Sequence, residues 1–240
     1  MNIYMWSGPR NLSTALMRSF ESRNDTIVWD EPLYAYYLKE TKKKHPLKEE
    51  IINTYETDIN KLILSMIKKN KNNKIFYQKH MTHHILDKTP IDWINNGINC
   101  FLIRDPRDVM ISYIKKNEIE NKNDLGFHKQ IDIFNFIKKS FAHPIVINAD
   151  DLSNKPKIVL KKLCEKIKIP FSEKMLSWKK GKRESDGIWE KIWYKNVQSS
   201  SKFEKLEKKD LIIPKKHLSI YQQCLTIYNE INNYNILNGK

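Results

Sequence analysis

Residues 2–20 read NIYMWSGPRNLSTALMRSF, and this stretch decides the fold. It begins with a short apolar run, passes through a Ser-Gly-Pro turn and continues with apolar residues at spacings of three and four. That order predicts a buried strand over Asn2–Trp6, a tight turn and a helix whose apolar side carries Leu12, Leu16 and Phe20. A strand that leads through a turn into a helix is typical of an α/β domain.

The same alternation continues along the 240 residues. Apolar runs predict further strands at residues 27–29, 74–78, 99–103 and 144–148. Helical spacing predicts further helices at residues 47–69, 90–95, 106–116, 131–141, 155–168 and 215–232. Strands that alternate with helices imply one α/β domain with a mostly parallel central sheet and helices on both faces. Ligands of such sheets bind beyond the carboxyl ends of the strands.

The net charge of +15 comes from 43 Lys and Arg residues against 28 Asp and Glu residues. A positive field of this size attracts anions. Nearly all of the basic residues are Lys, in a chain that is also rich in Asn and Ile, and this pattern is typical of a solvated lysine background. The six arginines are more informative, because their planar guanidinium groups suit bidentate contacts with phosphate.

Several classes of protein are disfavoured by the sequence. The three Cys residues are widely spaced and include no CxxC pair, so neither a disulfide framework nor a structural zinc site is expected. The N-terminus meets a Gly-Pro turn too early for a signal peptide, and no apolar run approaches the length of a membrane span. We therefore expect a cytoplasmic protein with no membrane partner. The basic residues are scattered and no nucleic-acid-binding motif is present, so no nucleic-acid partner is expected.

The turn after the first strand has the chemistry of a phosphate-binding loop. Unpaired N–H groups at the start of a helix attract an anion. Ser13 and Thr14 add hydroxyl donors, and Arg10 adds a cation. The GxxxxGK[ST] pattern of nucleoside triphosphatases is absent. The alternative is a simple strand–turn–helix corner in which Ser13 is the N-cap.

A second motif, NCFLIRDPRDVMISY, spans residues 99–113. Asp105 suits the N-cap of the following helix, and Pro106 its first turn, so both have a structural reason. Arg104 lies at the end of the strand, where the sheet presents ligands. Ser112 follows about two helical turns later, so Arg104 and Ser112 are expected to share one phosphate. The alternative is that Arg104 pairs with a neighbouring carboxylate.

These two motifs, followed by NADDLSNKPKIVLKKLCEKIKIPF at residues 148–171, resemble the sulfotransferase superfamily. The first motif aligns with a family pattern close to PRSGTTL, and the second with R-[DN]-P-[RK]-D-V-x-x-S-Y. The resemblance is strong over residues 1–178 and weak over 179–240. It implies a P-loop-like three-layer domain, the donor 3′-phosphoadenosine 5′-phosphosulfate and no metal. It also implies that the nucleotide is bound by Arg10, Asn11, Leu12, Ser13, Thr14, Arg104 and Ser112.

The chain departs from the family pattern at two places. Asn11 and Leu12 stand where the family usually has Ser-Gly, and the loss of Gly restricts the backbone of the loop. The family's late RKGxxGDW motif has only a rough echo at residues 179–189, to which we assign no binding.

Two residues are candidates for the base that removes the acceptor proton. Glu31 follows the second strand and resembles the catalytic Glu of the tyrosylprotein branch; alternatively, it caps the next helix beside Pro32. His80 leaves the third strand and resembles the His of the family's KTHLP motif. Aligning Lys79 with the Lys of that motif instead loses the His, and a one-residue slip on a strand reverses the face that a side chain takes. His80, His83 and His84 also suggest a metal site, but no HExxH pattern accompanies them.

The sequence thus predicts an enzyme that moves a sulfuryl group to a hydroxyl or amine of a small-molecule or carbohydrate acceptor. One alternative is a Mg²⁺-dependent P-loop nucleotide kinase, and another is a non-catalytic nucleotide- or polyanion-binding protein. The acceptor pocket is expected from residues 33–48, 117–128 and 178–193. Neither the acceptor nor the oligomeric state follows from the sequence.

Overall fold

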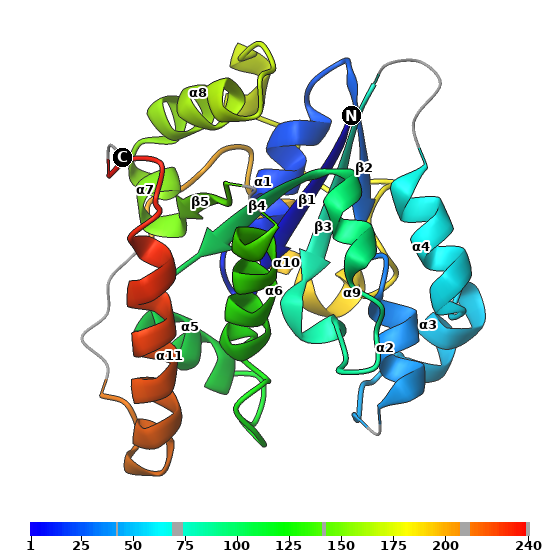
Figure 1. The fold of residues 1–240 in the computed structure, drawn as a ribbon, viewed down its shortest axis with the longest axis vertical. Helices are drawn as coiled ribbons and strands as arrows, with labels where there is room; N and C mark the ends of the chain where they lie inside the picture. Colours follow the sequence, from blue (N-terminus) through cyan, green and yellow to red (C-terminus); the bar gives the residue numbers. More distant parts are fainter. Residues whose placement is uncertain (42, 69–73, 141–142, 207–211, 239–240) are drawn as a thin grey trace.

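The computed structural model describes residues 1–41, 43–68, 74–140, 143–206 and 212–238. Five parallel strands form one sheet in the order β2-β3-β1-β4-β5 (Figure 1). The strands are β1 Asn2–Ser7, β2 Thr26–Asp30, β3 Ile75–Met81, β4 Ile98–Ile103 and β5 Ile145–Asn148. The five strands predicted from the sequence are therefore confirmed, with β3 running three residues further than expected.

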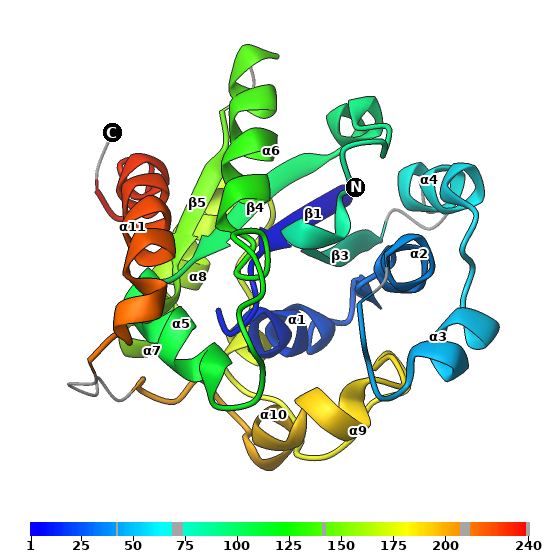
Figure 2. The same ribbon diagram turned by 90° about the horizontal axis from the view of Figure 1, so that it is seen from below.

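Helices cover both faces of this sheet (Figure 2). The α-helices are α1 Ser13–Glu21, α2 Tyr34–Glu40, α3 Lys48–Thr54, α4 Ile59–Ile67, α5 Pro106–Ile114, α6 Phe127–Lys139, α7 Ala149–Asn154, α8 Pro156–Lys166, α9 Glu190–Trp193, α10 Lys195–Ser199 and α11 Leu218–Asn232. Short 3-10 turns are η1 Thr82–His84, η2 Asp92–Asn96, η3 Glu173–Leu176 and η4 Lys215–His217.

The alternation of side chains along β1 divides the core into two layers. Ile3 and Met5 pack with α1, α7 and α8 on one face of the sheet. Tyr4 and Trp6 pack with α4, α6 and α11 on the other face. Successive side chains of a strand point to opposite faces, so a central strand that is apolar throughout needs cover on both sides. The predicted three-layer α/β fold is confirmed.

The predicted helices differ from the structure in places. The single helix expected over residues 47–69 is two helices, α3 and α4, and residue 69 lies outside the described part. Asp58 ends the continuity, because its side chain accepts hydrogen bonds from the N–H groups of Asn60 at 2.8 Å and Lys61 at 3.3 Å and so begins a new helix. The expected helix at 90–95 is the 3-10 turn η2, and α2 was not predicted. Residue 141, the expected end of α6, lies outside the described residues.

Replacing Asp58 tests this helix start. Asp58→Ala removes the side chain that caps α4, so we expect the free energy of unfolding to fall by about 1 kcal/mol. Urea denaturation followed by circular dichroism measures the change. The exposed Glu184 offers a control, because Glu184→Ala removes a carboxylate from a segment that starts no helix. An Asp58→Ala protein as stable as the control would contradict the capping role.

Candidate active site

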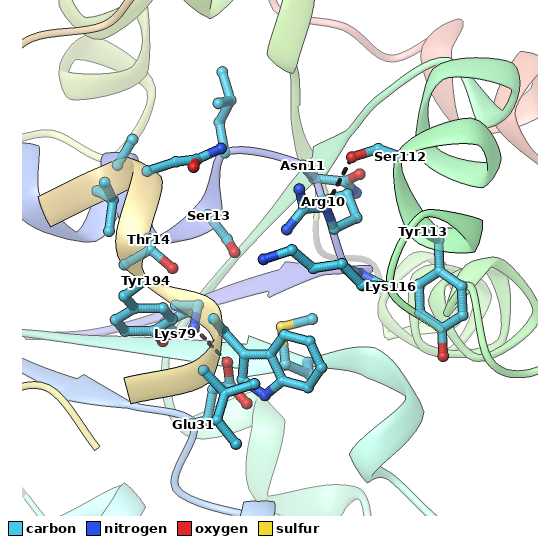
Figure 3. A pocket seen from close by; sticks show the side chains of 18 of the residues that line it. Arg10, Asn11, Ser13, Thr14, Glu31, Lys79, Ser112, Tyr113, Lys116 and Tyr194 are labelled. Carbon is cyan, nitrogen blue, oxygen red and sulfur yellow. Dashed lines mark hydrogen bonds and ion pairs between the residues drawn. The ribbon is translucent and has the colours of Figure 1, made fainter. Parts of the chain in front are cut away.

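A cavity of about 1000 Å³ lies beyond the carboxyl ends of the strands. The chain reverses its direction of travel across the sheet at β1, and this is where α/β sheets bind ligands. The segments that follow β1, β2, β3 and β4 each contribute side chains to the cavity wall (Figure 3). The nine residues proposed from the sequence are Arg10, Asn11, Leu12, Ser13, Thr14, Glu31, His80, Arg104 and Ser112, and all of them except His80 line this cavity.

The loop after β1 has an unusual backbone. Arg10 and Leu12 have φ angles of 66° and 64°, in the left-handed region that favours glycine. For a residue with a side chain this conformation costs about 1–2 kcal/mol. Leu12 is the position at which the family pattern has Gly, and its side chain packs against the core cluster around α1. The loop therefore adopts the glycine conformation without a glycine.

The start of α1 carries no side-chain cap. Leu12 is the N-cap residue, and no side chain accepts a hydrogen bond there. The alternative in which Ser13 is the N-cap is wrong, because Ser13 is already the first helical residue. Backbone N–H groups at an uncapped helix start favour an anion. Asn11 holds the loop in place, since its Nδ2 donates to the carbonyl of Leu102 in β4 at 3.2 Å.

The two sequence motifs are in direct contact. Arg10 Nε donates to Ser112 Oγ at 2.8 Å, as Figure 3 shows, although the two residues are 102 positions apart. Arg104 Nη1 donates to the carbonyl oxygen of Arg10 at 2.9 Å. Arg10 thus links Ser112 to Arg104, and the expectation that Arg104 and Ser112 share one phosphate stays a prediction. Burial and the positive charge of Arg104 both lower the pKa of Arg10.

Arg104 is only weakly compensated. Its Nη2 lies 3.9 Å from Asp108, a long distance for a charge-assisted hydrogen bond. Its Nε is buried and has no hydrogen-bond partner among the described residues. Two guanidinium groups that face one cavity, one with an unused buried donor, form a site that an anion would complete.

Glu31 lies in the cavity wall directly after β2, where the sequence placed it. Its Oε1 accepts a hydrogen bond from Lys79 Nζ at 2.5 Å (Figure 3). It does not cap the next helix, because the N-cap of α2 is Leu33 and no side chain caps it. Burial raises the pKa of Glu31, Lys79 opposes this shift, and the net direction is upward.

His80 lies elsewhere. It is inside β3, paired in register with Trp6, and its ring stacks on the Trp6 indole with centroids 4.6 Å apart. This places the ring in the core layer beneath η2, where it is 1% exposed. Burial lowers the pKa of His80 to about 3, so the ring is neutral. The structure therefore brings Glu31, but not His80, to the cavity.

Lys79 takes the opposite face of β3 and is the residue that the sequence reasoning missed. It pairs in register with Asp30, and its Nζ lies 2.8 Å from Asp30 Oδ1 and 2.7 Å from the Tyr194 hydroxyl. The sequence does carry a signal for it, because Lys79 can be aligned with the Lys of the family's KTHLP motif. No sequence pattern pointed to Tyr194.

The late segment after residue 178 forms another part of the wall. It is fastened to α1 by an ion pair of 2.6 Å between Asp186 and Arg18, both of which are buried. Trp193 lines the cavity, whereas Trp189 is 2% exposed in a core cluster with Tyr34. The rough echo at residues 179–189 does not line the cavity.

Comparison with known proteins identifies the family of the chain that forms this cavity. The family model named Sulfotransferase domain matches residues 1–232. The chain belongs to the sulfotransferase domain family. The match extends over the late segment, where the resemblance seen in the sequence was weak.

Two curated relatives of this sulfotransferase-domain protein come from Arabidopsis thaliana. It is 34% identical to Branched-chain-amino-acid aminotransferase-like protein 2 over 227 residues, which are 95% of the chain and 40% of that protein. It is 34% identical to Branched-chain-amino-acid aminotransferase-like protein 1 over 232 residues, which are 97% of the chain and 42% of that protein. The chain thus spans about two fifths of the length of these relatives.

Solved structures share the fold of this sulfotransferase-domain protein. The sulfotransferase domain of the Synechococcus PCC 7002 olefin synthase has a TM-score of 0.57 at 12% identity, with 93% of this chain and 94% of that chain covered. The sulfotransferase domain from the curacin biosynthetic pathway has a TM-score of 0.55 at 18% identity, with 92% and 96% covered. These likenesses concern the fold, which is the P-loop-like α/β fold of sulfotransferases.

Two further observations apply to the described residues of this sulfotransferase-domain protein. No group of three or more His, Cys, Asp or Glu side chains within them is arranged to hold a metal ion. No helix within the same residues is long and apolar enough to cross a membrane.

The buried His80 predicts an acid-sensitive fold. The unfolded chain binds a proton on this imidazole near pH 6.5, whereas the folded chain binds it only near pH 3. The stability that the neutral His80 ring contributes is therefore complete above pH 6.5 and is lost as the pH falls from 6.5 toward 3. The slope of the unfolding free energy against pH is proportional to the number of protons taken up on unfolding. We expect His80→Phe to reduce that number by about one.

Urea unfolding between pH 7.5 and 5 measures that slope. His143→Gln at an exposed position is the matched control. Equal slopes for the wild-type protein and His80→Phe would mean that His80 is not held neutral in the core.

Proposed function

We propose that this protein transfers a sulfuryl group from 3′-phosphoadenosine 5′-phosphosulfate to a hydroxyl or amine of an acceptor. The contact between Arg10 and Ser112 is the observation that carries the proposal. It joins the two motifs that, by resemblance, bind one nucleotide, and both motifs open into a single cavity. One bisphosphorylated adenosine therefore has anion-binding groups for each of its ends.

The residues present suit such a nucleotide. The N–H groups at the start of α1, with the hydroxyls of Ser13 and Thr14, would bind the 5′ end. Arg10, Arg104 and Ser112 would bind the 3′-phosphate, and an anion there would use the free Nε of Arg104 and relieve the repulsion between the two guanidinium groups. Asn11 and Leu12 would shape the loop through their backbone and packing.

The reaction requires little from the protein beyond alignment, proton removal and charge neutralisation. The acceptor oxygen or nitrogen attacks sulfur, the bond from sulfur to the bridging phosphate oxygen breaks, and the bisphosphate nucleotide leaves with that electron pair. Glu31 takes the acceptor proton. A carboxylate whose pKa is raised by burial is a better base near neutral pH than an ordinary one.

The acceptor would lie beside Glu31. The wall on that side carries the rings of Tyr34, Tyr37 and Trp193, which suit a small-molecule or carbohydrate acceptor with an apolar face. We further propose that the protein works in the reducing cytoplasm, a location compatible with its three free and buried cysteines.

Nucleotide binding is the first test. The wild-type protein should bind 3′-phosphoadenosine 5′-phosphate in the absence of Mg²⁺, and Arg104→Ala should weaken binding about 10- to 100-fold because a charge-assisted contact is lost. Isothermal titration calorimetry measures both affinities. Arg107→Ala is the matched control, because Arg107 belongs to the same motif but does not line the cavity.

Turnover of ATP with Mg²⁺ in place of binding to 3′-phosphoadenosine 5′-phosphate would instead support a kinase. Equal losses in Arg104→Ala and Arg107→Ala would also contradict the proposed site.

Replacing the base is the second test. Glu31→Gln keeps the shape of the side chain but cannot accept the proton, so we expect transfer to fall about 10²- to 10⁴-fold with unchanged nucleotide affinity. In the wild-type protein the rate should fall as the pH drops through the raised pKa of Glu31, since only the carboxylate is active. Transfer of labelled sulfate to an acceptor library gives both results. A fully active Glu31→Gln protein would exclude Glu31 as the base.

A further inference from the structure

The ammonium group of Lys79 is fully engaged inside the protein. An ammonium has three donors. Those of Lys79 are directed at Asp30 at 2.8 Å, Glu31 at 2.5 Å and the Tyr194 hydroxyl at 2.7 Å. The Lys79 side chain is 1% exposed. Lys79 is therefore saturated by protein groups, and it lines the cavity beside Glu31, which accepts one of its hydrogen bonds.

Asp30 is held by a separate set of donors from the late segment. The Tyr194 hydroxyl lies 2.7 Å from Asp30 Oδ2 and 2.9 Å from Oδ1. Trp189 Nε1 donates to Oδ2 at 3.1 Å, and the N–H of Gly187 donates to it at 3.3 Å. A carboxylate is an acceptor with several lone pairs, so it can accept hydrogen bonds from all of these groups. Three donors of the late segment therefore hold Asp30 in addition to Lys79.

The position of Gly187 shows how closely this segment is packed. A Cβ atom there would lie 2.1 Å from the Trp189 ring, so only glycine allows the indole to reach Asp30. The ion pair between Asp186 and Arg18 fastens the same segment to α1. The segment is thus built to deliver Trp189 and Tyr194 to one carboxylate next to the proposed base.

Few charges face Glu31. His84 Nε2 lies 4.0 Å from Glu31 Oε2, but burial lowers the pKa of His84 well below its usual value, so the ring is neutral. Burial raises the pKa of both Tyr34 and Tyr194, so both phenols stay protonated. Among the residues that the structure describes, the charged groups that act on Glu31 are Lys79 and Asp30. One cation is therefore shared by two carboxylates.

We propose that Asp30, fixed by Trp189 and the N–H of Gly187, is a positioning residue that draws on the Lys79 ammonium and so keeps Glu31 basic enough to remove the acceptor proton. This inference rests on the proposed function of Glu31. Lys79 holds the Glu31 side chain in place, and Asp30 limits how far the positive charge stabilises the Glu31 carboxylate. The negative charge of Asp30 contributes to raising the pKa of Glu31, in the same direction as burial.

The first variant is Asp30→Asn. It removes one negative charge and leaves the Lys79 charge to Glu31 alone, so the pKa of Glu31 should fall. We expect the acid limb of the rate profile to move to lower pH by about one unit, and the plateau rate to fall because the base is weaker. Affinity for 3′-phosphoadenosine 5′-phosphate should stay unchanged, since Arg10 and Arg104 are untouched.

The second variant is Tyr194→Phe, which is milder and predicts the opposite sign. The Tyr194 hydroxyl lowers the pKa of Glu31, so its removal should move the acid limb to higher pH. Tyr36→Phe is the matched control. It also removes a buried tyrosine hydroxyl, in this case one bonded to Thr89 outside the cavity, and should leave the acid limb in place.

The ionisation of Glu31 is also measured without turnover. The ¹³C resonance of its side-chain carboxyl, assigned by its loss in Glu31→Gln, gives the pKa directly in wild-type, Asp30→Asn and Tyr194→Phe proteins. Opposite shifts in the two variants support the inference even if no transfer is detected, a result that would count against the proposed function alone. An unchanged Glu31 titration in both variants would overturn the inference, whatever happens to the rate.

Discussion

The parallel pairing of β1 between β3 and β4 is the constraint on which the site depends. Parallel strands end at the same edge of a sheet, so the segments after β1, β3 and β4 must meet there. This pairing brings Arg10 to Ser112 and places Lys79 one strand away from the phosphate loop. The α-helices on both faces bury β1, β4 and β5 almost completely, and polar side chains gather at the edge beyond the carboxyl ends of the strands.

Local sequence was enough to predict the five strands, their mostly parallel arrangement and eight of the residues that line the cavity. Each strand is a short apolar run that ends in turn residues, and such runs are specified by their own composition. Arg104 was identifiable because it follows a strand and because no structural role, such as the helix cap at Asp105, explains its presence there. The helices were less predictable, since the apolar spacing of residues 47–69 continues through the cap at Asp58. The hydrogen bonds that begin α4 do not alter that spacing.

The choice between His80 and Lys79 shows where sequence reasoning reaches its limit. Neighbouring residues on a strand face opposite ways, and composition does not fix which of the two points to the cavity. The register with Trp6 settles it, and this register depends on contacts between distant parts of the chain. Tyr194 was beyond reach for the same reason, because it meets Asp30 across 164 positions.

The left-handed backbone at Leu12 has a consequence for ligand association. Glycine would allow this conformation but would also leave the loop free to adopt others. Here the partly buried Leu12 side chain packs against the layer around α1, and this contact restricts the conformations of the turn. The loop then loses little conformational entropy when an anion binds, so the free-energy cost of ordering it is small. The loop after β1 therefore favours anion binding by being ordered before the anion arrives.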